Sequence, residues 1–216
     1  MERGRGPARL AIDIGGTFTD LVVETARGRT TAKVLTTSDS PERAVLEGVR
    51  GVLPAAGLIP AEVSLVIHGT TLATNAIIER KGARTALITT DGFRDVLAIG
   101  DEGRFDQYDV NLIKTEPLIP RRRRLTVRER IAAGGEVLIP LEEDAVRALL
   151  PELERLDVES VAVGFLHAYA NPAHERRCAE ILRAGLPDLW ITLSSEVCPE
   201  IREYERFTTA PANAYV

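Results

Sequence analysis

The chain has 216 residues, a formal net charge of -5 at pH 7, 44% hydrophobic residues and 27% charged residues. This composition is typical of a globular protein with a sizeable core, and no apolar run is long enough to cross a bilayer. The acidic balance argues against nonspecific nucleic-acid binding, because phosphate backbones attract basic surfaces. Two cysteines are too few for a disulfide framework, and the N-terminus lacks the apolar segment of a secretory signal. We therefore expect a cytoplasmic protein.

The first part of the chain alternates between strand and helix patterns. Three strands are predicted in quick succession, followed by two helix–strand units. This order predicts an α/β fold with a mixed sheet and helices on both faces. The order also resembles the ribonuclease-H-like half of the actin, sugar-kinase and heat-shock ATPase superfamily. The predicted strands span 9–15, 19–24, 30–36, 64–68 and 84–90, and the predicted helices begin at Pro41 and span 71–80.

The rest of the chain predicts an inserted region and a return to α/β alternation. Polar loops, a strand over 124–131 and a returning strand over 137–140 suggest an inserted hairpin. A helix over 142–156 should kink or split at Pro151. Strands follow at 160–167 and 189–193, around a helix over 171–185. We expect a disordered tail over 1–8, a phosphate-binding core over 9–92, the insertion over 93–140, and an α/β continuation over 141–216 that stops before a second lobe.

The stretch "AIDIGGTFTD" is the first candidate site. Two glycines remove Cβ atoms from a turn, so that backbone N–H groups can approach phosphate oxygens. The acids suit a hard cation such as Mg²⁺, which takes oxygen ligands. The alternative is a plain hairpin turn with a turn-stabilising acid. The residues concerned are the acids Asp13 and Asp20, the glycines Gly15 and Gly16, and the hydroxyl donors Thr17 and Thr19.

Other nucleotide-binding signatures are missing from the sequence. There is no G-x-G-x-x-G after a strand and no G-x-x-x-x-G-K-[ST] loop. The chain holds three lysines, Lys33, Lys81 and Lys114. We therefore expect phosphate binding to depend on backbone N–H groups, hydroxyls and metal.

The stretch "HGTTLATNA" is the second candidate site. His68 ends a predicted strand, Gly69 opens a turn, and the following threonines begin a helix, where exposed N–H groups suit an anion. The alternative makes one threonine an N-cap and His68 a hydrogen-bonded strand end. The remaining candidates in this stretch are Thr70, Thr71 and Asn75.

Other polar residues form weaker candidates. His174 and Cys178 have the helical spacing of metal ligands, but two ligands alone rarely make a metal site. His167 follows a buried strand and either functions or caps its neighbours. The run Arg121–Arg124 is interpreted as a solvated loop or edge strand, with a phosphate or subunit contact as the alternative. A polar loop is interpreted as solvated, with substrate contact as the alternative; its residues are Asp101, Glu102, Arg104 and Asp106.

Four stretches in order resemble the N-terminal region of the hydantoinase A and 5-oxoprolinase family. They are "AIDIGGTFTDLVV", "VIHGTTLATNAIIERKGARTALITTDGFRDVLAIG", "GFLHAYANPAHE" and "ERFTTAPANAYV". Relatives in this family include ATP-dependent N-methylhydantoinases and acetone and acetophenone carboxylase subunits. The resemblance implies an actin-like ATPase fold and an enzyme that uses Mg-ATP to activate the carbonyl of a cyclic amide or ketone.

The resemblance also implies roles for individual residues. Asp13 would orient Mg²⁺ or its water, the glycine turn with Thr17 would hold phosphates, and Asp20 would assist at the reacting end. His68, Thr70, Thr71 and Asn75 would line the reaction cleft. The isolated chain is expected to be incomplete for turnover without a downstream hydantoinase A domain or a separate subunit.

Two other functions stay open at this point, together with the possibility of a homo-oligomer. One is a noncatalytic lobe that completes its site by docking another chain; the other is a sugar-kinase-like phosphotransferase. We expect an exposed apolar patch near the C-terminus, where residues have lost their covering. The patch would comprise Phe207, Ala210, Ala214 and Tyr215.

Overall fold

The structure is a computed structural model that describes residues 7–37, 39–101, 108–111 and 113–216. The chain divides into two compact units, Met1–Glu79 and Arg80–Val216, and each is described by itself. Most of the predicted N-terminal tail, and Glu102, Arg104 and Asp106 of the polar loop, lie outside the described residues. Among the residues that are described, no helix is long and apolar enough to span a membrane.

Unit 1 is a four-stranded mixed sheet with the strand order β3-β2-β1-β4. The first three strands form an antiparallel meander, and β4 runs parallel to β1. The strands are β1 (Ala8–Ile14), β2 (Phe18–Thr25), β3 (Gly28–Leu35) and β4 (Val63–Thr70). The helices are α1 (Pro41–Ala55), the 3-10 turn η1 (Pro60–Glu62) and α2 (Leu72–Ile78).

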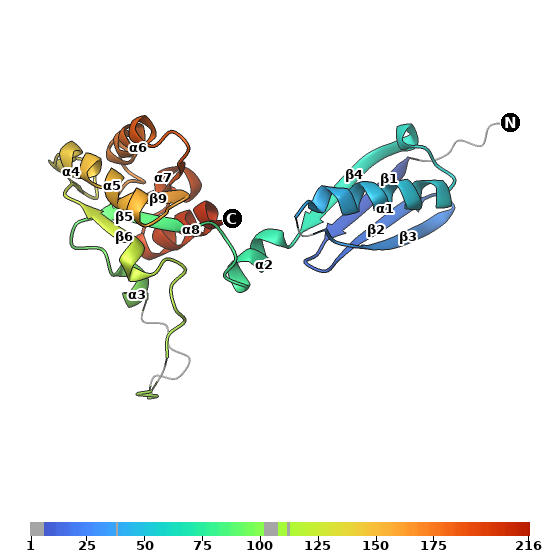
Figure 1. Ribbon diagram of the computed structural model, residues 1–216, viewed down its shortest axis with the longest axis horizontal. Helices are drawn as coiled ribbons and strands as arrows, with labels where there is room; N and C mark the ends of the chain where they lie inside the picture. The colour runs from blue at the N-terminus through green and yellow to red at the C-terminus, as the bar shows by residue number, and fades with distance from the viewer. Residues whose placement is uncertain (1–6, 38, 102–107, 112) are drawn as a thin grey trace. The chain divides into compact units, whose positions relative to one another are not determined.

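Helix α1 packs along one face of this sheet (Figure 1). Alternate residues of β1, such as Leu10 and Ile12, are buried against Val52 and Leu53 of α1, because successive side chains of a strand point to opposite faces. Asp13 lies on the other face and is exposed.

Unit 2 is built on a four-stranded parallel sheet with the strand order β10-β9-β5-β6 and a separate hairpin, β7-β8. Its strands are β5 (Thr85–Thr90), β6 (Arg124–Val127), β7 (Arg130–Ile131), β8 (Val137–Ile139), β9 (Ser160–Gly164) and β10 (Trp190–Leu193). Its helices are α3 (Val96–Ile99), the 3-10 turn η2 (Arg121–Arg123), α4 (Glu143–Ala148), α5 (Leu150–Arg155), α6 (Ala173–Gly185), α7 (Ser194–Val197) and α8 (Glu203–Tyr215).

Helices cover both faces of the unit 2 sheet. Ile88 and Val163 face the apolar side chains of α4, α5 and α6. Leu87 and Ala162 face Leu97 of α3 and residues of α8. A parallel sheet covered in this way has apolar residues on both faces, and every residue of β5 and β9 is buried. The α/β class, the mixed sheet and the inserted hairpin predicted from the sequence are confirmed.

Several boundaries differ from the prediction. The strand over 84–90 does not extend the first sheet but pairs with β6 and β9 in unit 2. The strand over 124–131 is two strands, β6 and β7, and Glu129 between them is hydrogen-bonded to His174. The predicted helix break near Pro151 is confirmed, since α4 ends at Ala148 and α5 begins at Leu150.

The C-terminal helix α8 corrects another expectation. Phe207 and Ala210 are 0% exposed and Tyr215 is 9% exposed, so the predicted apolar patch is wrong. Helix α8 packs on the sheet because Gly164 leaves room for an aromatic ring: a Cβ atom there would lie 2.7 Å from Phe207. Phe207 and Ala210 of α8 are part of the core of unit 2.

Candidate functional site

A row of charged side chains crosses the open face of the unit 1 sheet. Asp13 of β1 is directly opposite Asp20 of β2, and Asp20 is directly opposite Lys33 of β3. On the other side of β1, Asp13 is aligned with Gly69 of β4. A Cβ atom at Gly69 would lie 3.6 Å from Oδ1 of Asp13. The strand register therefore brings two carboxylates together beside a residue that has no side chain.

The glycine turn between β1 and β2 lies at the end of this row. The N–H group of Gly15 donates to the carbonyl oxygen of Phe18 at 2.9 Å, and a Cβ atom at Gly15 would lie 2.9 Å from that oxygen. A Cβ atom at Gly16 would lie 2.9 Å from Nδ2 of Asn75. Within the described residues, the N–H groups of Gly16 and Thr17 donate to no acceptor. The turn therefore holds two exposed residues with free donors.

Thr36 fixes the shape of this turn, although no sequence motif points to it. Its N–H group donates to the carbonyl oxygen of Thr17 at 2.9 Å, and its hydroxyl donates to the carbonyl oxygen of Gly15 at 2.9 Å. The Thr36 hydroxyl also lies 2.9 Å from that of Thr19, which is 0% exposed. Since Thr36 donates to Gly15, Thr19 donates to Thr36. Thr19 therefore supports the turn from inside instead of presenting a free hydroxyl.

The second motif packs against the first. The N–H group of Thr71 donates to the carbonyl oxygen of Ile14 at 3.1 Å, and Nδ2 of Asn75 lies 3.3 Å from the Thr71 hydroxyl. The Thr70 hydroxyl accepts the N–H group of Leu72 at 3.2 Å. Threonine and asparagine of this motif thus hold the start of α2 beside the glycine turn.

His68 is not on the same face as the carboxylates. The register aligns it with Ile12, which is buried against α1, and aligned residues of neighbouring strands share a face. Asp13 follows Ile12 in β1, so its side chain points to the opposite face of the sheet. The structure therefore brings together Asp13, Asp20, the glycine turn, Gly69 and Asn75, and it separates His68 and the buried Thr19 from them.

A different set of polar side chains is buried in unit 2. Nδ1 of His174 lies 2.8 Å from the Glu129 carboxylate, which is 2% exposed. Burial raises the pKa of the Cys178 thiol, and Cys178 and Cys198 are both free. No group of three potential metal-ligating side chains occurs among the described residues. His174 thus makes a buried hydrogen bond to Glu129, while Nδ1 of His167 lies 2.8 Å from the Ile131 carbonyl oxygen.

The arginine run stays at the surface of unit 2, with one exception. Arg121 pairs with Asp95 at 2.9 Å, which lowers the pKa of the Asp95 carboxyl through hydrogen bonding. Arg124 is 3% exposed and donates to the Ile119 carbonyl oxygen at 2.9 Å. Asp101 is exposed. The run is therefore partly a structural element of the core and not a solvated loop throughout.

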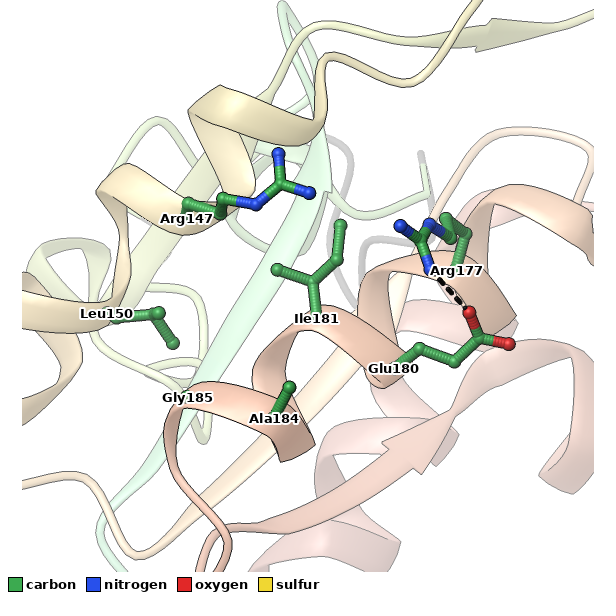
Figure 2. A pocket seen from close by; sticks show the side chains of 7 residues that line it. All are labelled: Arg147, Leu150, Arg177, Glu180, Ile181, Ala184 and Gly185. Carbon is green, nitrogen blue, oxygen red and sulfur yellow. Dashed lines mark hydrogen bonds and ion pairs between the residues drawn. The ribbon is translucent and has the colours of Figure 1, made fainter.

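Unit 2 also has a surface depression of about 300 Å³ between α4, α5 and α6 (Figure 2). Arg177 is already paired with Glu180 and with Glu143. Hydrogen bonds from Arg177 and then Arg147 lower the pKa of Glu143 to about 2. Because these charges satisfy one another, the depression is a helix-packing groove and not a second candidate site.

Residues 9–186 match the family described as the hydantoinase/oxoprolinase N-terminal region. The chain belongs to this family. It is 37% identical over 215 residues to caprolactamase subunit alpha from Pseudomonas jessenii, covering 96% of this chain and 31% of the relative. It is 36% identical over 252 residues to 5-oxoprolinase from Saccharomyces cerevisiae, covering 98% of this chain and 19% of that relative.

A solved structure gives the same result for the fold. The nucleotide-free structure of acetone carboxylase, described as part of a study of ATP-dependent acetone carboxylation, matches with a TM-score of 0.87 and 26% identity. The match covers 98% of this chain and 32% of that one. The hydantoinase/oxoprolinase chain described here thus spans about a third or less of these relatives, all of which extend well beyond the matched region.

Proposed function

We propose that unit 1 binds the phosphates of Mg-ATP for an ATP-dependent enzyme that opens cyclic amides. The observation that carries the proposal is the row in which Asp13 and Asp20 face each other next to a glycine turn with free N–H groups. Caprolactamase and 5-oxoprolinase are both named for lactam substrates, which supports a cyclic amide as the substrate class.

The donor set fits magnesium and phosphate. Mg²⁺ is bound in proteins through one or two carboxylates together with substrate phosphates and waters, and Asp13 is exposed and not ion-paired within the described residues. Free N–H groups in a glycine turn suit phosphate oxygens. Asp13 would hold the cation or its water, and Gly16 and Thr17 would donate to the phosphates.

The residues of unit 1 would act mainly by positioning and charge stabilisation, which dominate phosphoryl transfer. Mg-ATP, when bound, would supply the phosphoryl group that activates the amide carbonyl. The side chain of Asn75 would hold the glycine turn in place, and Gly69, which has no side chain, would leave space next to Asp13. His68 has no part in the proposal, because its register places it on the opposite face.

A partner for this site follows from the length of the relatives. The caprolactamase relative is an alpha subunit, and the match covers 31% of its length. We propose that the substrate-binding groups come from a downstream hydantoinase A domain or from a separate subunit. A noncatalytic lobe that serves such a partner would use the same phosphate site and differ only in turnover.

Titration calorimetry with magnesium plus either inorganic tripolyphosphate or ATP tests the proposal. Asp13→Asn should weaken the binding of either magnesium complex by about tenfold or more, because an ionised carboxylate makes stronger contacts than a neutral amide. Asp39→Asn is the matched control, because Asp39 is an exposed acid of the same unit that pairs with Arg43. Equal affinities of the two variants would contradict the metal role of Asp13.

A second variant tests the turn itself. Gly16→Ala would push Asn75 away, because the new Cβ atom would lie 2.9 Å from its Nδ2. We expect weaker binding of tripolyphosphate, partly restored when Asn75→Ala is added. Unchanged binding by the single variant would show that the phosphates do not use this turn.

A further inference from the structure

The structure places one of the three lysines beside the candidate phosphate site. Nζ of Lys33 lies 2.8 Å from Oδ1 and 3.0 Å from Oδ2 of Asp20. The same ammonium group lies 5.0 Å from the centre of the Phe18 ring. Phe18 is the residue whose carbonyl oxygen closes the glycine turn. The ammonium group therefore extends from Asp20 toward the turn.

The position of Lys33 follows from strand register and not from a flexible loop. Lys33 is aligned with Asp20, and Asp20 with Asp13, so all three side chains lie on the face that α1 leaves open. The Lys33 side chain is 55% exposed. A lysine ammonium group is a compact charge with three donors on a flexible four-carbon stem. It can therefore leave Asp20 for a more highly charged anion without moving the backbone.

The charge of the row also favours this role. Two carboxylates and one ammonium group leave the row with an excess of negative charge, which suits a cation but repels a free polyphosphate. The side chains of Lys33 and Asp20 are 55% and 49% exposed, so solvent screens their attraction and the pair can be exchanged for a more highly charged anion. A metal ion at Asp13 would offset part of the negative charge of the two acids. The Lys33 ammonium group would then be free to face the phosphates.

We infer that Lys33 is a phosphate-binding residue of this site: its ion pair with Asp20 is the resting state, and it donates to the terminal phosphate of a bound polyphosphate. This inference rests on the proposed function. It replaces the expectation that phosphate binding here depends only on backbone, hydroxyls and metal.

The same two strands provide a matched control. Arg29 pairs with Glu24 at 2.9 Å across β2 and β3, in the same register as Lys33 and Asp20. Arg29 lies four residues from Lys33 along β3, roughly 13 Å at the usual rise of a strand. Lys33→Gln and Arg29→Gln thus remove the same charge from the same kind of cross-strand pair, near the turn and far from it.

The experiment measures the affinity of the 216-residue chain for magnesium tripolyphosphate and Mg-ATP by calorimetry. Lys33→Gln should lose about tenfold in affinity, and Arg29→Gln less than about twofold. Circular dichroism and urea unfolding of each variant check that the fold is kept. Equal affinities of the two variants would overturn the inference.

A second comparison separates phosphate contact from simple neutralisation of Asp20. If Lys33 only neutralises Asp20, then Lys33→Gln should have no effect once Asp20→Asn is present. We expect the double variant to bind several-fold more weakly than Asp20→Asn alone. No difference between these two would overturn direct contact.

The two proposals fail in different ways. If the wild-type chain binds and Asp13→Asn weakens it while Lys33→Gln does not, the phosphate site stands and the inference about Lys33 falls. If Lys33→Gln weakens binding and Asp13→Asn does not, Lys33 stands and the metal role of Asp13 falls. A folded wild-type chain with no affinity for either probe would overturn both.

Discussion

The contact between Gly164 and Phe207 gives a quantitative test of how α8 packs on the sheet of unit 2. Phe207 is 0% exposed, and a Cβ atom at Gly164 would lie 2.7 Å from its ring. Phe207→Ala should destabilise unit 2 by about 3–5 kcal/mol, as for other buried phenylalanines. Gly164→Ala should cost about 1–3 kcal/mol in the wild-type background, because the added methyl group overpacks the core.

The two substitutions should be far from additive. Once Phe207 is alanine, the methyl group at position 164 meets no ring, and replacing a strand glycine should be neutral or stabilising by up to about 1 kcal/mol. The coupling free energy should therefore be about 2 kcal/mol or more, with the double variant more stable than the sum of the singles predicts.

Guanidinium unfolding followed by far-UV circular dichroism and by fluorescence of the single tryptophan, Trp190 of β10, measures this coupling. Gly51→Ala is the control, since a Cβ atom at Gly51 in α1 would meet nothing within 4 Å. It should stabilise unit 1 by about 0.5–1 kcal/mol whatever residue stands at 207. Additivity of Gly164→Ala and Phe207→Ala within about 0.5 kcal/mol would refute the packing described for α8.

Three further predictions concern the turn, the cysteines and an exposed carboxylate. Thr36→Val should destabilise unit 1 by about 1–3 kcal/mol in urea unfolding, since it leaves the carbonyl oxygen of Gly15 unpaired. Thr36→Ser keeps the hydroxyl and should stay near wild type. Equal stabilities of the two variants would contradict the role of the Thr36 hydroxyl in holding the turn. In the folded chain a thiol reagent should label half-buried Cys198 quickly and buried Cys178 only after unfolding, because burial raises the pKa of the Cys178 thiol; mass spectrometry of labelled peptides would expose the reverse order. The pKa of Glu143 is lowered from 4.5 to about 2 by hydrogen bonds from Arg177, so its stabilising effect is present above pH 4.5 and is lost as the pH falls toward 2. The Tm difference between wild type and Glu143→Gln should shrink over that window, and a constant difference would contradict the pairing.

The sequence predicts much of unit 1 because its signals are local. Glycines at 15 and 16 and alternating apolar residues define the turn and the two faces of β1. The face on which Asp13 lies free could not be predicted, since it depends on where α1 packs. Lys33 could have been found: counting outward from the two-residue turn between Thr25 and Gly28 pairs it with Asp20.

The sequence predicts less of the structure where contacts between distant segments set the position of a residue. The pattern over 84–90 is a good strand in either sheet, and only its partners β6 and β9, far along the chain, assign it to unit 2. Thr36 is one hydroxyl among many until the register brings it to the turn. The sequence predicts an exposed Phe207, because nothing local shows that Gly164 makes room for it.

The most direct test of the central claim is an NMR titration of the ¹⁵N-labelled chain with magnesium tripolyphosphate. If the glycine turn holds phosphate, the amide signals of Gly16 and Thr17 should shift first and saturate with the binding curve, while those of Gly51 and Gly164 stay in place. Saturable binding that leaves the Gly16 and Thr17 signals unchanged would contradict the account.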